Sequence, residues 1–358
     1  MFFENLDGLR FVAFLLVYVQ HAFGIPGAAG AGVAFFFVLS GFLITYLLLV
    51  EGERRGRVDV RAFYIRRALR IWPLYFLVIA FAFLLYPALK ALTGVQGGVQ
   101  NGNPWLYVFF LANFDVLKTV ARDGGGAGFI NVLWSISIEE QFYLLWPLLL
   151  RRPQRGRALG VLLAVIAFSS AFRLAHADDW PTLYFHSLSV ISDMAIGGLA
   201  AYTWRHSPGF RARVASLPAT VIACGYLAGA AFIATRGLWG PFTRLLAGVV
   251  FAAIVLEQNF CRRSLFKMSD SAIFSRLGQY TYGLYMLHMV VLFLLEKAFL
   301  LFGLAPSDRA HRVLLPLLGL PLSVFAAWAS HRLVESPFLR LKARFSPVAS
   351  GGVTRGHA

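Results

Sequence analysis

The chain has 358 residues, of which 58% are hydrophobic and 14% charged, and its mean hydropathy is +0.67. These values exclude a soluble globular protein and a disordered one. The net charge of +16 would favour nucleic-acid binding in a soluble protein. Here the basic residues lie in short loops between apolar segments, which indicates membrane topology and attraction to anionic lipids, and no nucleic-acid partner.

Long apolar segments recur along the whole chain, as is typical of transmembrane helices. We expect helical membrane segments at about 6–24, 31–50, 71–90, 131–150, 158–176, 186–204, 218–235, 241–259, 277–302 and 312–334. The stretch 104–117 is short and contains Asn113 and Asp115, so we expect it to be re-entrant or interfacial. The sequence therefore predicts an all-α polytopic membrane protein with about ten transmembrane helices.

The arginine-rich loop 51–70 sets the expected orientation in the membrane. Cytoplasmic loops carry an excess of Lys and Arg, so this loop and the basic loop 151–157 are expected in the cytoplasm. The N- and C-termini then lie in the cytoplasm as well. We assign residues 1–340 to one membrane-embedded domain and expect 341–358 to be a basic, disordered cytoplasmic tail.

The first segment carries three informative polar side chains, Asp7, Arg10 and His21. His21 follows Arg10 by eleven positions, so both lie on one helical face, about 16 Å apart along the axis. Asp7 precedes Arg10 by one turn and is placed to pair with it. Such residues in a membrane helix usually face a cavity or a site. The alternatives are a snorkelling Arg10 and a polar His21 at the opposite interface.

Arg67 and Arg70 lie one turn apart at the expected cytoplasmic mouth of the third segment. Planar guanidinium groups suit bidentate binding of phosphate, so this pair is a candidate anion site. The alternative is charge that serves only membrane topology. That alternative explains the pair less well, because apolar and aromatic residues adjoin it.

Adjacent carboxylates, Glu139 and Glu140, stand in the first half of the crossing expected at 131–150. Helical spacing places Ser135, Glu139 and Tyr143 on one face, and Ser137 near Glu140 on another. Carboxylates inside a membrane segment need partners or water. They are either hydrated at the outer interface or line a polar cavity in which one carboxylate orients a histidine or a hydroxyl substrate.

Thr281, Tyr285 and His288 form a stripe along one face of a later crossing. A histidine bonded to a neighbouring helix is the structural alternative to a functional role there. The intramembrane Asp193 has no assigned role, and a cap or structural ion pair is at least as good an interpretation of Glu335 as catalysis. No P-loop, GxSxG, HExxH or CxxC motif is present, and no spacing predicts a metal site.

Together and in this order, these motifs resemble the acyltransferase-3 family of integral membrane acyltransferases over essentially the whole chain. The matching elements are LDGLR with the following His21, then FFFVLSGFLIT, FYIRRALRIWPLY, WSISIEEQFYLLWP, YTYGLYMLH and VESP. The chain departs from many relatives at Ile191, two residues before Asp193, where those relatives have an arginine.

The resemblance implies a ten-helix enzyme of the bacterial inner membrane. Such an enzyme moves an acyl group, most often acetyl, from cytoplasmic acyl-coenzyme A to a hydroxyl of a cell-surface glycan or lipid-linked sugar. Because the chain ends soon after the last helix, the expectation is a stand-alone unit without the C-terminal SGNH domain of certain relatives. No metal is expected.

The residues and the resemblance lead to one mechanistic hypothesis. Arg67 and Arg70 hold the phosphates, Arg10 either does the same or orients the thioester, and His21 removes the proton of the acceptor hydroxyl. Glu139 is expected to orient the imidazole of His21. The supporting residues are Asp7, Ser137, Tyr143, Tyr285 and His288. Two alternatives stay open: an acyl relay on His21 itself, and a transporter or flippase of glycan precursors without acyl transfer.

Overall fold

The computed structural model describes residues 3–93, 102–123, 128–152, 154–234 and 240–345, and this part of the chain is helical throughout, without a strand. The first nine helices are α1 Glu4–Phe23, α2 Ala28–Arg55, α3 Val60–Ala80, α4 Tyr86–Thr93, α5 Pro104–Val108, α6 Ala112–Asp123, α7 Leu133–Leu149, α8 Arg155–Ala175 and α9 Trp180–Phe185. The others are α10 Ser187–His206, α11 Pro208–Ala215, α12 Ala219–Ala234, α13 Thr243–Phe260, α14 Ala272–Gln279, α15 Thr281–Leu301, α16 Arg309–Ser330 and α17 Ser336–Ala343.

In the described residues, eight helices or continuous helical runs are long and apolar enough to cross a membrane. They are Glu4–Phe23, Ala28–Arg55, Val60–Ala91, Arg155–Ala175, Trp180–His206, Gly240–Phe260, Thr281–Leu301 and Arg309–Lys342. The pair α11 and α12, bent by 90°, raises this number to nine. Helix α7, which is 17 residues long, lies where the sequence predicts the crossing 131–150. The predicted all-α polytopic membrane fold is confirmed.

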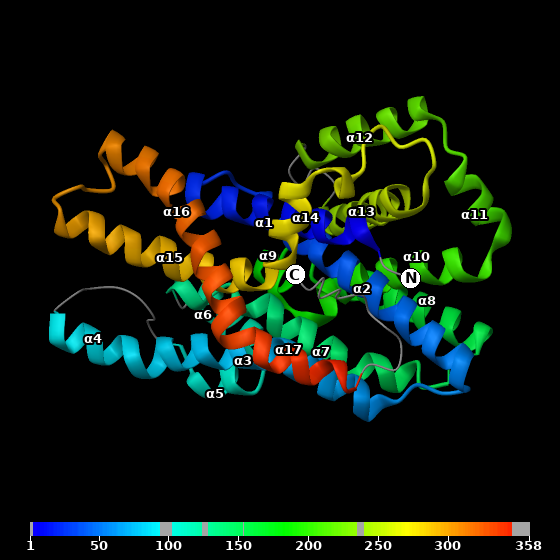
Figure 1. Cartoon of the computed structure of the whole chain (residues 1–358), viewed down its shortest axis with the longest axis horizontal. Coiled ribbons are helices and arrows are strands. Elements are labelled where there is room, and N and C mark those ends of the chain that lie inside the picture. The colour runs from blue at the N-terminus through cyan, green and yellow to red at the C-terminus, as the bar shows by residue number, and fades with distance from the viewer. Residues whose placement is uncertain (1–2, 94–101, 124–127, 153, 235–239, 346–358) are drawn as a thin grey trace, which may run out of the picture.

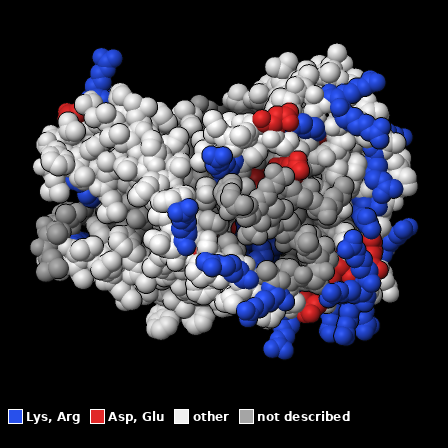
Figure 2. All heavy atoms as spheres, in the orientation of Figure 1, with Lys and Arg blue, Asp and Glu red and all other residues white. Residues whose placement is uncertain are grey.

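The basic loops gather at one end of the molecule. Figure 1 places the ends of α4, α15 and α16 at one extreme of the long axis, and α8, α11 and the end of α2 at the other. In Figure 2 the Lys and Arg side chains concentrate at the second extreme. The backbone N–H of Val58 donates to the carbonyl of Arg151 over 2.9 Å, which joins the two basic loops directly. They therefore lie at the same membrane face.

Helix α3 begins earlier than the apolar pattern predicts. The side chain of Asp59 accepts a hydrogen bond from the N–H of Ala62 over 2.9 Å and caps the helix eleven residues before the expected start at 71. Arg67 and Arg70 therefore lie within the helix and project from it, instead of preceding it. The helix continues through a π-helical turn, Phe81–Leu85, into α4.

The stretch 104–117 forms no crossing, as expected, but it consists of two short helices, and the second extends to Asp123. They meet at Phe110, whose φ of 56° lies in the left-handed region that non-glycine residues rarely occupy. Two contacts hold this conformation. The ring of Phe110 stacks on Tyr75 at 4.5 Å, and its carbonyl accepts a hydrogen bond from Gln141 over 2.8 Å. The pair of short helices α5 and α6 is thereby fixed to α3 and α7.

The last described helix, α17, also differs from the expected boundary. It runs to Ala343, three residues past the end assigned to the membrane domain, and packs against α3. Lys342 is therefore part of this helix and lies near Arg66 and Arg67. Residues 346–358 lie outside the described residues.

Helices α2 and α10 approach each other closely through glycine. A Cβ atom at Gly197 would lie 2.1 Å from the carbonyl oxygen of Val38, and one at Gly41 would lie 2.0 Å from the carbonyl oxygen of Met194. Small residues at such contacts let membrane helices pack backbone to backbone. This pair of helices forms the centre of the bundle, with α1, α8 and α13 packed around it.

We expect Gly197→Ala to destabilise the protein, because the backbone of α2 must move to accommodate the new methyl group. The expected loss is roughly 1–3 kcal/mol, measured as thermal unfolding in detergent. Gly160→Ala in α8 is the matched control, since nothing lies within 4 Å of a Cβ atom there. It should be neutral or stabilising, in line with helix propensity. Equal stability of the two variants would contradict the close packing of α2 and α10.

Candidate active site

Two histidines face each other across α1 and α15. The Nδ1 atom of His21 and the Nε2 atom of His288 are 3.0 Å apart, and the ring planes are inclined by 21° with centroids 5.2 Å apart. His288 is completely buried, whereas His21 is partly exposed. His288 is further held by the edge of Phe14, with ring centroids 5.6 Å apart. The two helices thus present one accessible imidazole backed by one buried imidazole.

Tyr285 continues this arrangement toward α7. Its hydroxyl lies 2.6 Å from the hydroxyl of Ser135, and both hydroxyls lie 3.2 Å from the carbonyl oxygen of Val132, which can accept a hydrogen bond from either. The backbone carbonyl of Tyr285 accepts a hydrogen bond from the Nδ1–H of His288 over 2.7 Å. Helix α15 is therefore fixed to α7 at the level where His288 contacts His21.

Glu139 does not contact His21, and the expectation that it orients that imidazole is wrong. Its carboxylate accepts hydrogen bonds from the hydroxyls of Ser40 and Tyr143. The guanidinium of Arg67 lies over the Tyr143 ring, 5.1 Å from its centroid, and within electrostatic reach of Glu139. The physical reason is helix rotation: the face of α7 that carries Glu139 turns toward α2 and α3. Glu139 thus belongs with the arginines and not with the imidazoles.

Ser137 and Glu140 have structural contacts of their own on α7. The hydroxyl of Ser137 accepts a hydrogen bond from the backbone N–H of Ala112 over 3.3 Å and lies 3.5 Å from the hydroxyl of Tyr75. Glu140 accepts a hydrogen bond from the indole N–H of Trp72 over 3.1 Å. Ser137 therefore positions the start of α6 against α3.

Five cations from three helices gather near the start of α1. Lys342 of α17 lies within electrostatic reach of Arg10 of α1 and of three arginines of α3, which are Arg66, Arg67 and Arg70. Two of the arginines are paired: Arg10 with Asp7 over 2.8 Å, as the sequence predicts, and Arg66 with Glu51 over 3.4 Å. The cluster joins the basic end of α1 to α3 and to the C-terminal helix.

Arg70 is a member of this cluster that is placed to bind a ligand. In the part of the chain that the structure describes, it forms neither a hydrogen bond nor an ion pair, and its strongest electrostatic neighbours are the cations Arg10 and Arg67. Like charges at close quarters in a poorly solvated site are unfavourable unless an anion joins them. The arrangement is therefore suited to an anionic ligand with several negative charges.

Lys342 is the residue of this cluster that the sequence did not reveal. Its position among basic residues near the C-terminus is typical of a cytoplasmic tail. The signal that was available is the VESP motif followed by eight further residues without Gly, which permits helix α17. No pattern in the sequence indicates that this helix packs on α3.

A separate buried ion pair connects α10 and α13. The Nε of Arg244 donates to the carboxylate of Asp193 over 2.6 Å, and Asp193 is completely buried. Arg173 of α8 lies beside this pair and donates to the hydroxyl of Ser189 over 2.6 Å and to the carbonyl of Pro241 over 2.6 Å. The partner of Asp193 therefore comes from α13.

Glu335, at the start of α17, accepts a hydrogen bond from the hydroxyl of Ser330 over 3.0 Å and lies 3.9 Å from His331. One of its oxygens is 3.3 Å from the position that a Cβ atom of Gly283 would occupy. These contacts link α15, α16 and α17 around the π-helical turn His331–Glu335.

Within the described residues, no three His, Cys, Asp or Glu side chains gather closely enough to hold a metal ion.

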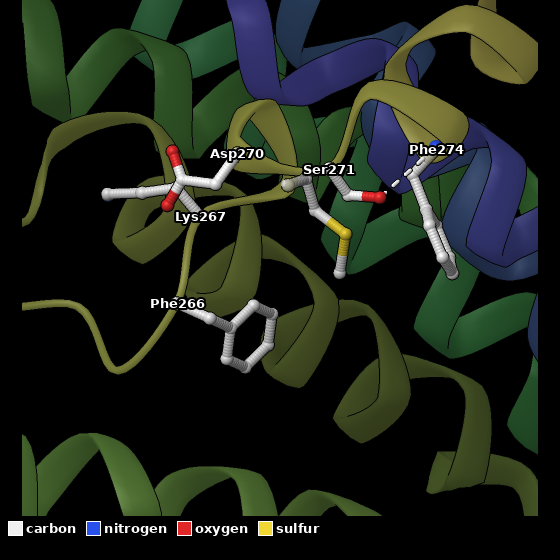
Figure 3. Close-up of a pocket in the computed structure, with 6 residues that line it drawn as sticks. Phe266, Lys267, Asp270, Ser271 and Phe274 are labelled. Carbon is white, nitrogen blue, oxygen red and sulfur yellow. Dashed lines mark hydrogen bonds between the residues drawn. The ribbon is translucent and has the colours of Figure 1, made fainter.

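A surface pocket of about 440 Å³ lies between α13 and α14 (Figure 3). Its lining residues are Phe266, Lys267, Met268, Asp270, Ser271 and Phe274. The ammonium group of Lys267 donates to the carbonyls of Glu257 and Gln258, and burial lowers the pKa of this lysine. Lys267 thus caps the C-terminal end of α13. The pocket shares no residue with the histidine pair or the cation cluster, so it is not the candidate active site.

The helical membrane fold thus contains two groups of side chains suited to chemistry, the imidazole pair and the cation cluster. Comparison with known proteins shows the class of protein to which this fold belongs. A family model described as an acyltransferase domain matches residues 3–332, so the chain belongs to this family, acyltransferase-3.

Similar proteins are found in several bacteria. The Listeria monocytogenes peptidoglycan O-acetyltransferase OatA is 33% identical over 40% of this chain and 23% of its own length. The Bacillus subtilis protein YrhL, provisionally named a peptidoglycan O-acetyltransferase, is 30% identical over 57% of this chain and 33% of its own length. A Staphylococcus aureus protein provisionally named an O-acetyltransferase, SACOL0978, is 23% identical over 94% of this chain and 57% of its own length.

The match thus spans from about a quarter to just over half of the length of these relatives. No solved structure matches the chain.

The buried pair generates a test of stability. Arg244→Met should destabilise the protein by about 3–5 kcal/mol, because it leaves the Asp193 carboxylate buried without its partner. The double variant Asp193→Asn/Arg244→Met should recover much of this loss. Denaturant unfolding of the wild type, both single variants and the double variant gives the coupling energy. Arg263→Met, at an exposed position, is the control. Additive losses would show that the two side chains do not stabilise each other.

Proposed function

We propose that this chain is an O-acyltransferase of the bacterial inner membrane that uses acyl-coenzyme A, with acetyl as the preferred acyl group. The acceptor is a hydroxyl of a cell-envelope glycan or a lipid-linked sugar. One observation carries the proposal: helix α1 presents Arg10 within the cation cluster and, three turns further along, His21 beside His288. An anion site and an imidazole thus lie along one helix.

The donor side of the proposal rests on charge. Coenzyme A carries several phosphate charges, and a cluster that includes Arg67, Arg70 and Lys342 offers guanidinium and ammonium groups in a partly desolvated site. Glu139 and Tyr143 hold Arg67 in place. Arg66 of this cluster pairs with Glu51, which lies near the end of α2 just before the first basic loop. Basic loops favour the cytoplasmic face, where acyl-coenzyme A is available.

The chemical side of the proposal rests on His21. A sugar hydroxyl is a weak nucleophile, and a neutral imidazole that accepts its proton contributes roughly 10²–10⁴ in rate. About 16 Å of helix separates His21 from Arg10. A donor whose phosphates bind at the cluster must therefore reach inward along α1 with its extended arm to bring the thioester to His21.

The acceptor side rests on the relatives. OatA is named a peptidoglycan O-acetyltransferase, and YrhL is provisionally named as one. A glycan hydroxyl is therefore the acceptor class that we propose, and the acyl group would reach it through the membrane-embedded site.

The first experiment incubates the purified protein in nanodiscs with radiolabelled acetyl-coenzyme A and no acceptor. We expect reversible binding by the wild type and by His21→Ala. In a second incubation, to which a glycan acceptor is added, we expect acetyl transfer by His21→Ala to be lower than that of the wild type by at least about 10²-fold. Label that stays covalently on the wild type but not on His21→Ala would support the acyl relay on His21. Absence of binding by the folded wild type, also with longer acyl donors, would contradict the proposal and favour a transporter.

The anion site has a test of its own. Arg70→Met should raise the dissociation constant for acetyl-coenzyme A by roughly ten- to one hundred-fold, because one charge-assisted hydrogen bond is lost. Arg61→Met, at an exposed position of the same helix, is the matched control and should bind as the wild type does. Binding is measured by isothermal titration calorimetry. Equal affinity of both variants would remove Arg70 from the donor site.

A further inference from the structure

The hydrogen bonds of His288 determine which of its nitrogens carries a proton. Its Nδ1 atom lies 2.7 Å from the carbonyl oxygen of Tyr285 and 3.1 Å from that of Leu284. Carbonyl oxygens only accept hydrogen bonds, so Nδ1 of His288 is the donor. In a neutral imidazole the second nitrogen is then an acceptor. The Nε2 atom of His288 therefore offers a lone pair to His21.

His288 is neutral for a structural reason. It is completely buried, and in the described part of the chain its partners are two carbonyls, His21 and aromatic rings, with no carboxylate among them. An imidazolium in this position would be a buried charge without a counter-ion, which is strongly unfavourable. The contact of 3.0 Å with His21 thus requires the proton of that hydrogen bond to lie on His21.

We infer that His288 is a positioning residue that holds His21 in the tautomer with the proton on Nδ1. The Nε2 atom of His21 then carries the free lone pair and is the atom that meets the substrate. This inference rests on the proposed acyl transfer, and it names the atom and the orienting group that the reaction uses. It assigns to a second histidine the role that an acidic side chain has in hydrolase triads.

The assignment defines the path of the proton. The acceptor hydroxyl gives its proton to Nε2 of His21 while its oxygen forms a bond with the acyl carbon. The C–S bond then breaks, its electron pair goes to sulfur, and the thiolate takes the proton from Nε2. The Nδ1–H of His288 points at backbone carbonyls, which accept no further proton, so the proton cannot leave through His288. The same nitrogen would serve both the deprotonation and the protonation of the leaving group.

The tautomer is measured directly on the wild-type protein. Protein with ¹⁵N-labelled histidine in nanodiscs is examined by solid-state NMR, in which protonated and unprotonated imidazole nitrogens resonate far apart. The signals of His21 are assigned by their loss in His21→Ala. We expect a protonated Nδ1 and an unprotonated Nε2. The opposite pattern for His21 would overturn the inference, whatever the enzymatic activity is.

Two variants of His288 test the role in catalysis. In His288→Gln the amide oxygen takes the place of Nε2 and still accepts a hydrogen bond, whereas His288→Leu keeps the volume and offers no acceptor. We expect His288→Leu to lower kcat by roughly 10²-fold with an unchanged KM for the donor. His288→Gln should keep most of the activity and the wild-type tautomer. A purely structural role would instead make both variants equally impaired and equally unstable.

The outcomes separate this inference from the proposed function. If the wild type transfers no acyl group from acyl-coenzyme A, the proposed function fails, while the NMR result still decides the tautomer. If acyl transfer is present and His288→Leu, folded as judged by thermal unfolding, has a wild-type kcat, the positioning role of His288 is refuted and the proposed function stands.

Discussion

The constraint on which this structure depends is that polar side chains inside an apolar bundle must find their partners on other helices. Water is not available in the hydrocarbon region to satisfy them, and an unpaired group costs several kcal/mol. The pair Asp193 and Arg244 joins α10 to α13, and the pair Ser135 and Tyr285 joins α7 to α15. Each such contact fixes the rotation of two helices about their axes. The positions of the reactive side chains follow from these rotations.

The cation cluster departs from this rule. Arg10 and Arg66 have carboxylate partners, yet Arg70 has no hydrogen bond or ion pair in the described residues. If the cluster had only a structural role, every cation in it would be expected to have a carboxylate partner, because an uncompensated charge lowers stability. A site that must bind and release an anion needs the opposite, namely cations whose partner is the ligand. The arrangement around Arg70 is thus the one that the proposed donor site requires.

The sequence predicted the features that arise within single helices. The hydropathy pattern gave the membrane helices, and the spacing of Asp7 and Arg10 gave their ion pair, because both depend on the geometry of one helix. The sequence did not predict the contacts between helices. Glu139 was expected at His21, and His288 takes that place instead. Which of two polar residues reaches a third depends on the rotation of three helices, and no local pattern encodes that. The position of Lys342 beside the arginines of α3 could not be predicted for the same reason.

The choice of a histidine to orient His21 has a chemical consequence. A carboxylate on Nδ1 would make His21 a stronger base, since it would stabilise the imidazolium that forms. That carboxylate would also be a permanent charge at the completely buried position of His288, and its burial would have a large desolvation cost. A neutral imidazole fixes the tautomer without that charge but stabilises the imidazolium less. Such a base is sufficient when the donor is already activated, as a thioester is, and when a departing thiolate takes the proton back at once. The buried His288 therefore fits transfer from a thioester better than hydrolysis of an unactivated bond.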